Sequence, residues 1–270
     1  MNRTSIEWVK NPDGTQGYSF NPITGCLNHT NGRCEGGNFP CYACRLAHGR
    51  LRDRYLTNSN VADTTNRLRD PNSSLWDRVA TDPFYPRFWQ DRMADMVWQQ
   101  ETKPKGIFVC DMGELFGDWL PEQWQKQVFA AMGVNPQHRF YLLTKQPQNL
   151  IKWSPFPDNC WVGVTATNDD MAKQAINYLR QIEAKMKYIS FEPLLDGLLS
   201  DTIECVALEK PVDWVIIGAQ TRPTVYPRIE WVREIVEAAD KAGVPAFLKD
   251  NLRSALRFHS SGIWRQEMPA

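Results

Sequence analysis

The sequence predicts an α/β protein built on a complete or partial (β/α) barrel of about six to seven parallel strands. From about residue 85, short apolar runs rich in β-branched and aromatic residues alternate with longer amphipathic segments. The runs are apolar throughout, which is typical of parallel strands covered on both faces. No glycine-rich fingerprint follows the first strand, as it usually does in a Rossmann sheet. We therefore expect a single barrel domain over residues 1–270.

The expected elements follow one another along the chain. The first strand lies within TQGYSFNP, at 15–22, and a cysteine-rich loop comes directly after it. A polar segment at about 57–83 is expected to be a surface insertion. The later strands are expected at 106–112, 139–144, 160–166, 187–193, 213–219 and 244–250. Helices are expected at 121–133, 169–185 and 228–242, with a shorter one near 147–152.

Composition limits the possible partners of the chain. With 270 residues and 42% hydrophobic content, it can bury a full core without a disulfide scaffold. Basic and acidic residues balance at 31 each, so any affinity for nucleic acid must come from a local patch. The N-terminus lacks an apolar signal region, and no stretch approaches the roughly 18 apolar residues of a membrane span. We expect a cytoplasmic protein with no membrane partner.

Polar side chains follow most of the expected strands, at the end where barrel enzymes carry their chemistry. They are Asp111, Glu114, Thr144, Lys145, Thr165, Asn168, Glu192, Gln220, Thr221, Lys249 and Asp250. For any one of them, a capping or turn role is the competing interpretation. Glu192 and Lys249 stand out because each follows a buried apolar run, where a charge needs a partner or a ligand. We expect Lys249 to act on the substrate, by contacting an anionic group or by proton transfer; an ion pair with Asp250 or a neighbouring carboxylate is the alternative.

Four of the seven cysteines lie within nineteen positions of the loop after the first strand. They are Cys26, Cys34, Cys41 and Cys44. Thiolates bind soft or borderline metals, so a zinc site that uses all four or an iron–sulfur cluster is expected. A redox dithiol at CYAC and simple buried thiols also remain open. With zinc, the chain would be a non-enzymatic, zinc-stapled module that binds nucleic acid.

A set of ordered motifs carries a resemblance to a known superfamily. NPITGC, C-x6-CYA-x-RLA, DMGELF, YLLTKQP, WVGVT, ISFEPLL and DWVIIGA follow in this order between about residues 5 and 250. Together they resemble an uncharacterised, phage-associated branch of the radical S-adenosylmethionine superfamily. The resemblance implies a 4Fe–4S cluster held by Cys26, Cys34 and Cys41, with one iron left open for S-adenosylmethionine. Cys44 falls where relatives usually have another residue, and the usual C-x3-C-x2-C spacing is stretched here to C-x7-C-x6-C.

The same resemblance assigns expected roles to the strand-end residues. Glu114, in MGEL, matches the turn that holds the methionine amino group of the cofactor. Lys145 matches a partner of the methionine carboxylate, and Thr165 and Asn168 match residues that reach the ribose. Glu192 serves either the ribose or the substrate. The chemistry implied is reductive cleavage of S-adenosylmethionine to a 5'-deoxyadenosyl radical, with electrons from a donor such as flavodoxin or ferredoxin.

The substrate is not specified by these motifs. Four arginines follow the last clustered cysteine on an expected helix, and they favour nucleic acid. These are Arg45, Arg50, Arg52 and Arg54. A solvated helix face is the competing interpretation of this set, and a peptide or a small molecule is the alternative substrate.

Overall fold

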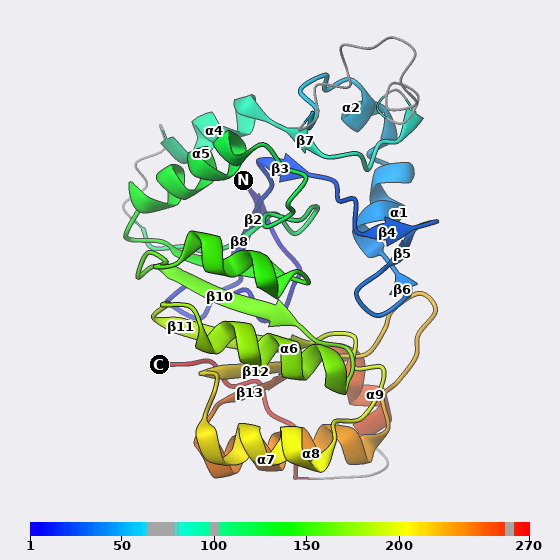
Figure 1. The fold of residues 1–270 in the computed structure, drawn as a ribbon, viewed down its shortest axis with the longest axis vertical. Helices are drawn as coiled ribbons and strands as arrows, with labels where there is room; N and C mark the ends of the chain where they lie inside the picture. Colours follow the sequence, from blue (N-terminus) through cyan, green and yellow to red (C-terminus); the bar gives the residue numbers. More distant parts are fainter. Residues whose placement is uncertain (64–78, 80, 98–102, 257–261) are drawn as a thin grey trace. The chain divides into compact units, whose positions relative to one another are not determined.

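The structure, a computed structural model, describes residues 1–63, 79, 81–97, 103–256 and 262–270. It is an α/β protein with a large, mostly parallel sheet of eight strands, in the order β1-β2-β8-β9-β10-β11-β12-β13 (Figure 1). The strands are β1 Asn2–Arg3, β2 Tyr18–Phe20, β8 Gly106–Val109, β9 Arg139–Thr144, β10 Cys160–Thr165, β11 Met186–Phe191, β12 Trp214–Ile217 and β13 Ala246–Leu248. The predicted α/β class is confirmed. Within the described residues β1 and β13 end the sheet, so the structure shows no closed barrel.

Contacts divide the chain into two compact units. The first comprises Met1–Ser5 and Val9–Leu142, and the second comprises Ile6–Trp8 and Leu143–Ala270. The expected insertion at about 57–83 falls largely on 64–78 and 80, which lie outside the described residues. In the described ranges, no helix combines the length and the apolar character that crossing a membrane requires.

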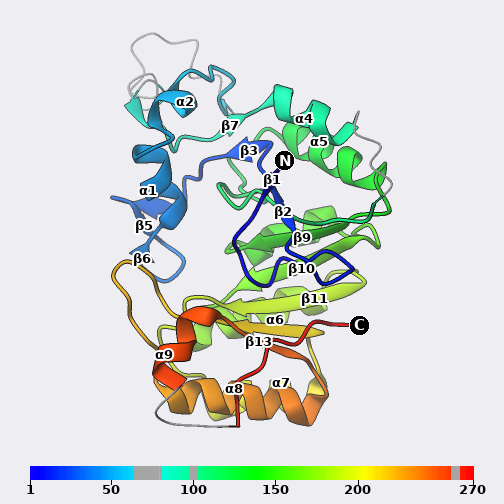
Figure 2. The ribbon, with the colours of Figure 1, turned by 180° about the vertical axis from the view of Figure 1, so that it is seen from behind.

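The first unit carries the cysteine loop directly after β2, as expected. β2 pairs in parallel with β8, and β8 with β9. The loop folds into β3 Ile23–Thr24, which pairs with β7 Arg87–Phe88, and a small antiparallel sheet of β4 His29–Thr30, β5 Arg33–Cys34 and β6 Phe39–Pro40. Beside that sheet lies α1 Tyr42–His48, in both views (Figure 1, Figure 2). The remaining helices of the unit are α2 Arg52–Leu56, α4 Gln90–Val97 and the predicted α5 Glu122–Gly133.

The second unit is a parallel arrangement of β10, β11, β12 and β13 with helices between them. The helices are η2 Pro147–Trp153, α6 Asp169–Arg180, α7 Ser200–Glu209, α8 Ile229–Ala242, η3 Asp250–Leu252 and α9 Arg253–Leu256. α6 packs on β10 and β11, and α7 packs along α8 (Figure 1). The sequence did not predict α7, and α6 ends five residues before the expected boundary at 185. The segment near 147–152 is a 3-10 helix.

Aromatic rings fill one face of the second unit near the amino ends of its strands. Trp214 has its ring centroid 6.0 Å from that of Trp161 and 5.6 Å from that of Tyr188. Trp8, from the N-terminal segment, packs on the same rings, with its centroid 6.0 Å from those of Tyr188 and Trp214. Because Trp8 is 1% exposed, its burial fixes the segment Ile6–Trp8 in this unit and brings in Glu7.

Replacing Trp8 with alanine should lower the free energy of unfolding by about 3–5 kcal/mol, because truncation of a buried tryptophan removes contacts and leaves a cavity. Urea denaturation measures this loss. Leu208→Ala is the control, since Leu208 is 72% exposed and its truncation should change stability by less than about 0.5 kcal/mol. Equal effects of the two substitutions would show that Trp8 does not anchor the segment.

Candidate functional site

The first cysteine of the loop is held against the turn after β8. The Gly25 N–H donates to the Met112 carbonyl at 2.9 Å, and the Glu114 N–H donates to the Gly25 carbonyl at 3.2 Å. Gly25 has a φ of +89°, and a Cβ there would lie 2.5 Å from the Phe84 carbonyl oxygen. Only glycine tolerates both constraints, so the backbone fixes Cys26 beside Glu114.

Three of the clustered thiols act on one another electrostatically. Burial raises the pKa of the Cys26 thiol well above its ordinary value, and the charges of Glu114, Cys34 and Cys41 raise it further. Charge effects of this kind act over several ångströms. Cys26 and Cys41 also pack against the same hydrophobic cluster. The Asn28 N–H donates to the Cys26 sulfur at 3.3 Å. The Cys41 sulfur accepts from the N–H of Cys44 at 3.5 Å and thereby caps α1.

The thiols of the loop can be compared with what each candidate metal group requires. No disulfide joins any of the seven cysteines, all of which the structure describes. The described residues also contain no group of three or more His, Cys, Asp or Glu side chains arranged to hold one metal ion. A single zinc ion would draw its thiolates to within about 4 Å of each other, given Zn–S bonds of about 2.3 Å. An iron–sulfur cluster distributes its thiolates over several irons, so neighbouring soft thiols fit it by ligand chemistry.

Cys44 is buried, as Cys34 is, whereas Cys26 and Cys41 are partly buried. It is 4% exposed and packs with Ala47 and Tyr55 in a hydrophobic cluster, against which Cys26 and Cys41 also pack. Its sulfur lies 3.5 Å from Nδ1 of His48, whose Nε2 lies 3.6 Å from an Asp82 carboxylate oxygen. Burial, with the charges of Cys41 and Asp82, raises the pKa of Cys44 to about 12. The side chain therefore serves the packing of α1, and the sequence did not predict that Asp82 lies near this group.

A hydrogen-bonded acid lies at the end of β8. The Asn21 amide donates to the Asp111 carboxylate at 2.5 Å, and the Tyr42 hydroxyl donates to the Asp111 carbonyl. Burial raises the pKa of Asp111 to about 6, against the lowering effects of Asn21 and Arg92. Because Tyr42 follows Cys41 directly, its bond ties the start of α1 to the end of β8. The sequence identified Asp111 as a strand-end residue but not its partners Asn21 and Tyr42.

In the second unit, Lys249 lies between two carboxylates. Its Nζ pairs with Oε1 of Glu192 and lies 3.4 Å from Oε2 of Glu7. Burial alone would lower the pKa of Lys249, but the charges of Glu192 and Glu7 raise it, so the side chain remains an ammonium. The structure thus contains the ion pair weighed as the alternative for Lys249, with Glu192 and Glu7 as partners. Asp250 instead pairs with Arg253 at 2.8 Å.

The other predicted residues of the second unit differ in their surroundings. Asn168 is the N-cap of α6, where its side-chain oxygen accepts from the Met171 N–H at 3.0 Å. Thr165 is 1% exposed, and its hydroxyl has no hydrogen-bond partner among the described residues. Lys145 follows β9 and is half-buried. The structure therefore brings Glu114 to the three cysteines in the first unit, whereas the second unit contains Lys145, Thr165, Asn168, Glu192 and Lys249.

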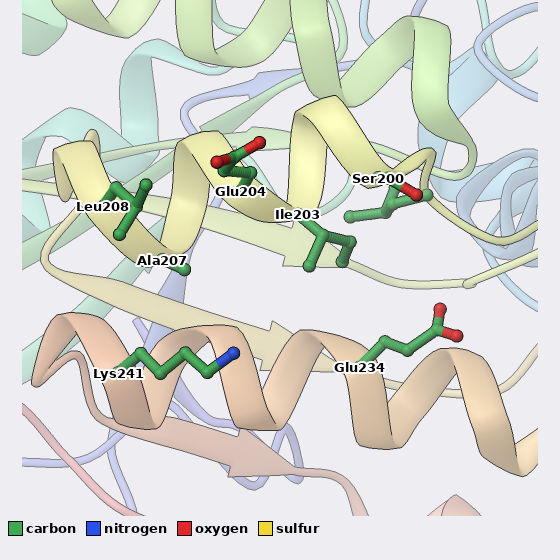
Figure 3. Close-up of a pocket in the computed structure, with 8 residues that line it drawn as sticks. Ser200, Ile203, Glu204, Ala207, Leu208, Glu234 and Lys241 are labelled. Atoms are coloured by element: carbon green, nitrogen blue, oxygen red, sulfur yellow. The ribbon is translucent and has the colours of Figure 1, made fainter.

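Two surface features lie outside these groups of residues. The arginines expected to favour nucleic acid are exposed on and between α1 and α2 of the first unit; they are Arg45, Arg50, Arg52 and Arg54. In the second unit, a groove runs between α7 and α8 (Figure 3). It is lined by Leu198, Ser200, Ile203, Glu204, Ala207, Leu208, Glu234 and Lys241, none of which was predicted as a site residue.

Comparison with known proteins establishes the family. A family model with the description "Protein of unknown function (DUF5131)" matches residues 3–255, and the chain therefore belongs to that family. Curated proteins and solved structures give no match.

The raised pKa of Asp111 predicts a specific dependence of stability on pH. Its folded value of about 6 exceeds its ordinary value of 3.8, so the neutral carboxyl favours folding and this contribution is lost as pH rises from 4 through 6. The stability of wild type relative to Asp111→Asn should therefore fall by about 2 kcal/mol between pH 4 and 7. Urea denaturation across this range measures the difference.

The control for this experiment is Asp118→Asn, because Asp118 is exposed. Its stability curve should run parallel to that of the wild type. Parallel curves for Asp111→Asn as well would show that the pKa of Asp111 is not raised in the folded protein.

Proposed function

We propose that this member of the family is a radical S-adenosylmethionine enzyme on a partial (β/α) barrel, with a 4Fe–4S cluster on Cys26, Cys34 and Cys41. The observation that carries the proposal is that Cys26 lies beside the turn that bears Glu114 and packs, as Cys41 does, against one hydrophobic cluster. The ordered motifs that resemble the superfamily support the same assignment.

The three-thiolate set suits a cluster that keeps one iron open. Cys44, which would close that position, is buried in a hydrophobic cluster against which Cys26 and Cys41 also pack, and its sulfur lies near Nδ1 of His48. When bound, the cluster would supply one electron to the sulfonium of S-adenosylmethionine, so that a carbon–sulfur bond breaks and the carbon radical takes hydrogen from the substrate. The electron would come from an external donor such as flavodoxin or ferredoxin.

The chain's own residues would bind and orient the cofactor. Glu114 is 7% exposed, and its carboxylate accepts from the Phe116 N–H at 3.0 Å, so its direction is fixed by backbone. A fixed, buried carboxylate beside Cys26 suits an ammonium group, which would be the α-amino group of the cofactor. Tyr42 holds the start of α1, and with it Cys41, at the end of β8.

The competing function is a non-enzymatic, zinc-stapled module that binds nucleic acid. The observation in its favour is the exposed set of arginines on and between α1 and α2, which suits a phosphate backbone. The same set would suit a nucleic-acid substrate of the proposed enzyme. Metal content therefore separates the two functions.

Protein reconstituted without oxygen should bind about four irons per chain and show visible absorption from the cluster. Alanine at Cys26, Cys34 or Cys41 should abolish both signals, because each removes one of three thiolates. Cys44→Ala is the matched control and should keep them. Stoichiometric zinc without iron would exclude the radical function, and equal losses for Cys44→Ala and Cys41→Ala would revive a four-thiolate site.

Replacing Glu114 with glutamine should weaken the binding of S-adenosylmethionine about 10- to 100-fold, because a charge-assisted hydrogen bond contributes about 1.5–3 kcal/mol. Equilibrium dialysis against the reconstituted protein measures this, with iron content confirming that the cluster is intact. Glu122→Gln serves as the control, because Glu122 is exposed in the first turn of α5. Normal binding by Glu114→Gln together with lost binding by Glu192→Gln would move the amino-group contact to Glu192.

A further inference from the structure

One face of the second unit carries a polar layer at the carboxyl ends of its strands. Thr165 is in register with Ser190, which in turn is in register with Ile216, and partners in register point to the same face. Side chains two residues further along share that face, so Glu192 lies beyond Ser190. Phe247 is the register partner of Ile216, and Lys249 lies two residues beyond Phe247 on the same face.

The position between Glu192 and Lys249 is kept open by a glycine. A Cβ on Gly218 would lie 3.0 Å from Cδ of Lys249 and 3.2 Å from Cγ of Glu192. A side chain here would therefore require Lys249 and Glu192 to shift by a few tenths of an ångström. Glycine at this position allows both of them to lie over the sheet and to meet Glu7.

The charges of Glu7, Glu192 and Lys249 do not balance. Two carboxylates, Glu7 and Glu192, share the single ammonium of Lys249, which leaves one net negative charge on the three side chains. Lys249 uses one oxygen of each carboxylate, and among the described residues neither acid has another partner. The Glu7 and Glu192 side chains are 25% and 27% exposed, so their remaining oxygens can be reached from solvent.

Two buried hydroxyls on the same face also lack hydrogen bonds. Thr165 and Ser190 are 1% and 0% exposed, and neither hydroxyl has a partner in the described part of the chain. Buried polar groups are normally paired, so such an orphan pair marks a place where a polar ligand or water completes the structure. The hydroxyls lie one pleat below Glu192, on the face that carries the two carboxylates.

We propose that Glu7, Glu192 and Lys249 form a binding site for a cationic group that carries N–H donors, an alkylammonium or a guanidinium. A cation would balance the excess negative charge, and its N–H groups would donate to the carboxylate oxygens that Lys249 leaves unused. Lys249 is then a positioning residue that holds the two acids together, and an anionic ligand is disfavoured. The Thr165 and Ser190 hydroxyls accept the remaining donors directly or through water.

The test measures binding of methylguanidinium chloride to the full-length chain by saturation-transfer NMR on its methyl signal. Binding should saturate, and Glu7→Gln and Glu192→Gln should each weaken it at least ten-fold. Glu237→Gln is the matched control, because Glu237 is exposed on α8. Tetramethylammonium, which has the charge but no N–H group, should bind at least ten-fold more weakly than methylguanidinium at the same ionic strength.

Three outcomes would overturn the site: unchanged binding in both glutamine variants, equal binding of the two cations, or displacement of methylguanidinium by inorganic phosphate at constant ionic strength. If circular dichroism shows that a variant does not fold, the comparison of the two cations on the wild-type protein still tests the site. All five residues of the site belong to the second unit, and the measurement needs no cluster. A negative result here therefore leaves the iron-binding proposal standing, and a chain without iron leaves this site standing.

Discussion

Parallel pairing of the strands is the constraint from which both groups of candidate residues follow. Parallel strands deliver their carboxyl ends to one edge of a sheet, and the chain there must turn through polar segments. In the first unit, β2 and β8 end beside each other, so the cysteine loop after β2 meets the turn after β8 through the backbone of Gly25. In the second unit, the register from β10 to β13 places Glu192 and Lys249 on one face. The position of each group of candidate residues thus depends on the order and pairing of the strands.

The buried polar groups at these strand ends each need a defined partner, because the partner offsets the hydration that the group loses on burial. Asp111 has Asn21, Glu114 has the Phe116 amide, and Lys249 has two carboxylates. Each partner fixes the direction of a charged side chain, which is the condition for selective binding. Gly25 and Gly218 contribute because they have no Cβ. A Cβ at either position would crowd a neighbouring carbonyl or charged side chain. The result in each unit is a set of side chains positioned before any ligand arrives.

The two groups differ in the softness and charge of their donors. Cys26, Cys34 and Cys41 are soft thiols beside a carboxylate, and this combination suits an iron–sulfur cluster next to an ammonium-bearing cofactor. Glu7 and Glu192 are hard oxygen donors that share one lysine, and this combination suits a cationic group with N–H donors. Cys44 shows why residue type alone does not decide function. It shares the CYAC motif and the hydrophobic cluster with Cys41, but Cys44 is buried and its sulfur lies near His48, whereas Cys41 is partly exposed.

The sequence by itself determined the α/β class, the positions of the main strands and the loop that carries the cysteines, because periodicity and composition are local properties. It also located Glu114, Glu192 and Lys249, since a charge directly after an apolar run is visible in one dimension. Only the tertiary structure decided which residues these side chains contact. Glu7 reaches Lys249 because Trp8 is buried against Tyr188 and Trp214, and Tyr42 reaches Asp111 across sixty-nine positions of sequence. The sequence left open whether the barrel is complete or partial, and it did not predict α7, for the same reason: strand pairing and helix packing depend on contacts between distant segments, which no local pattern encodes.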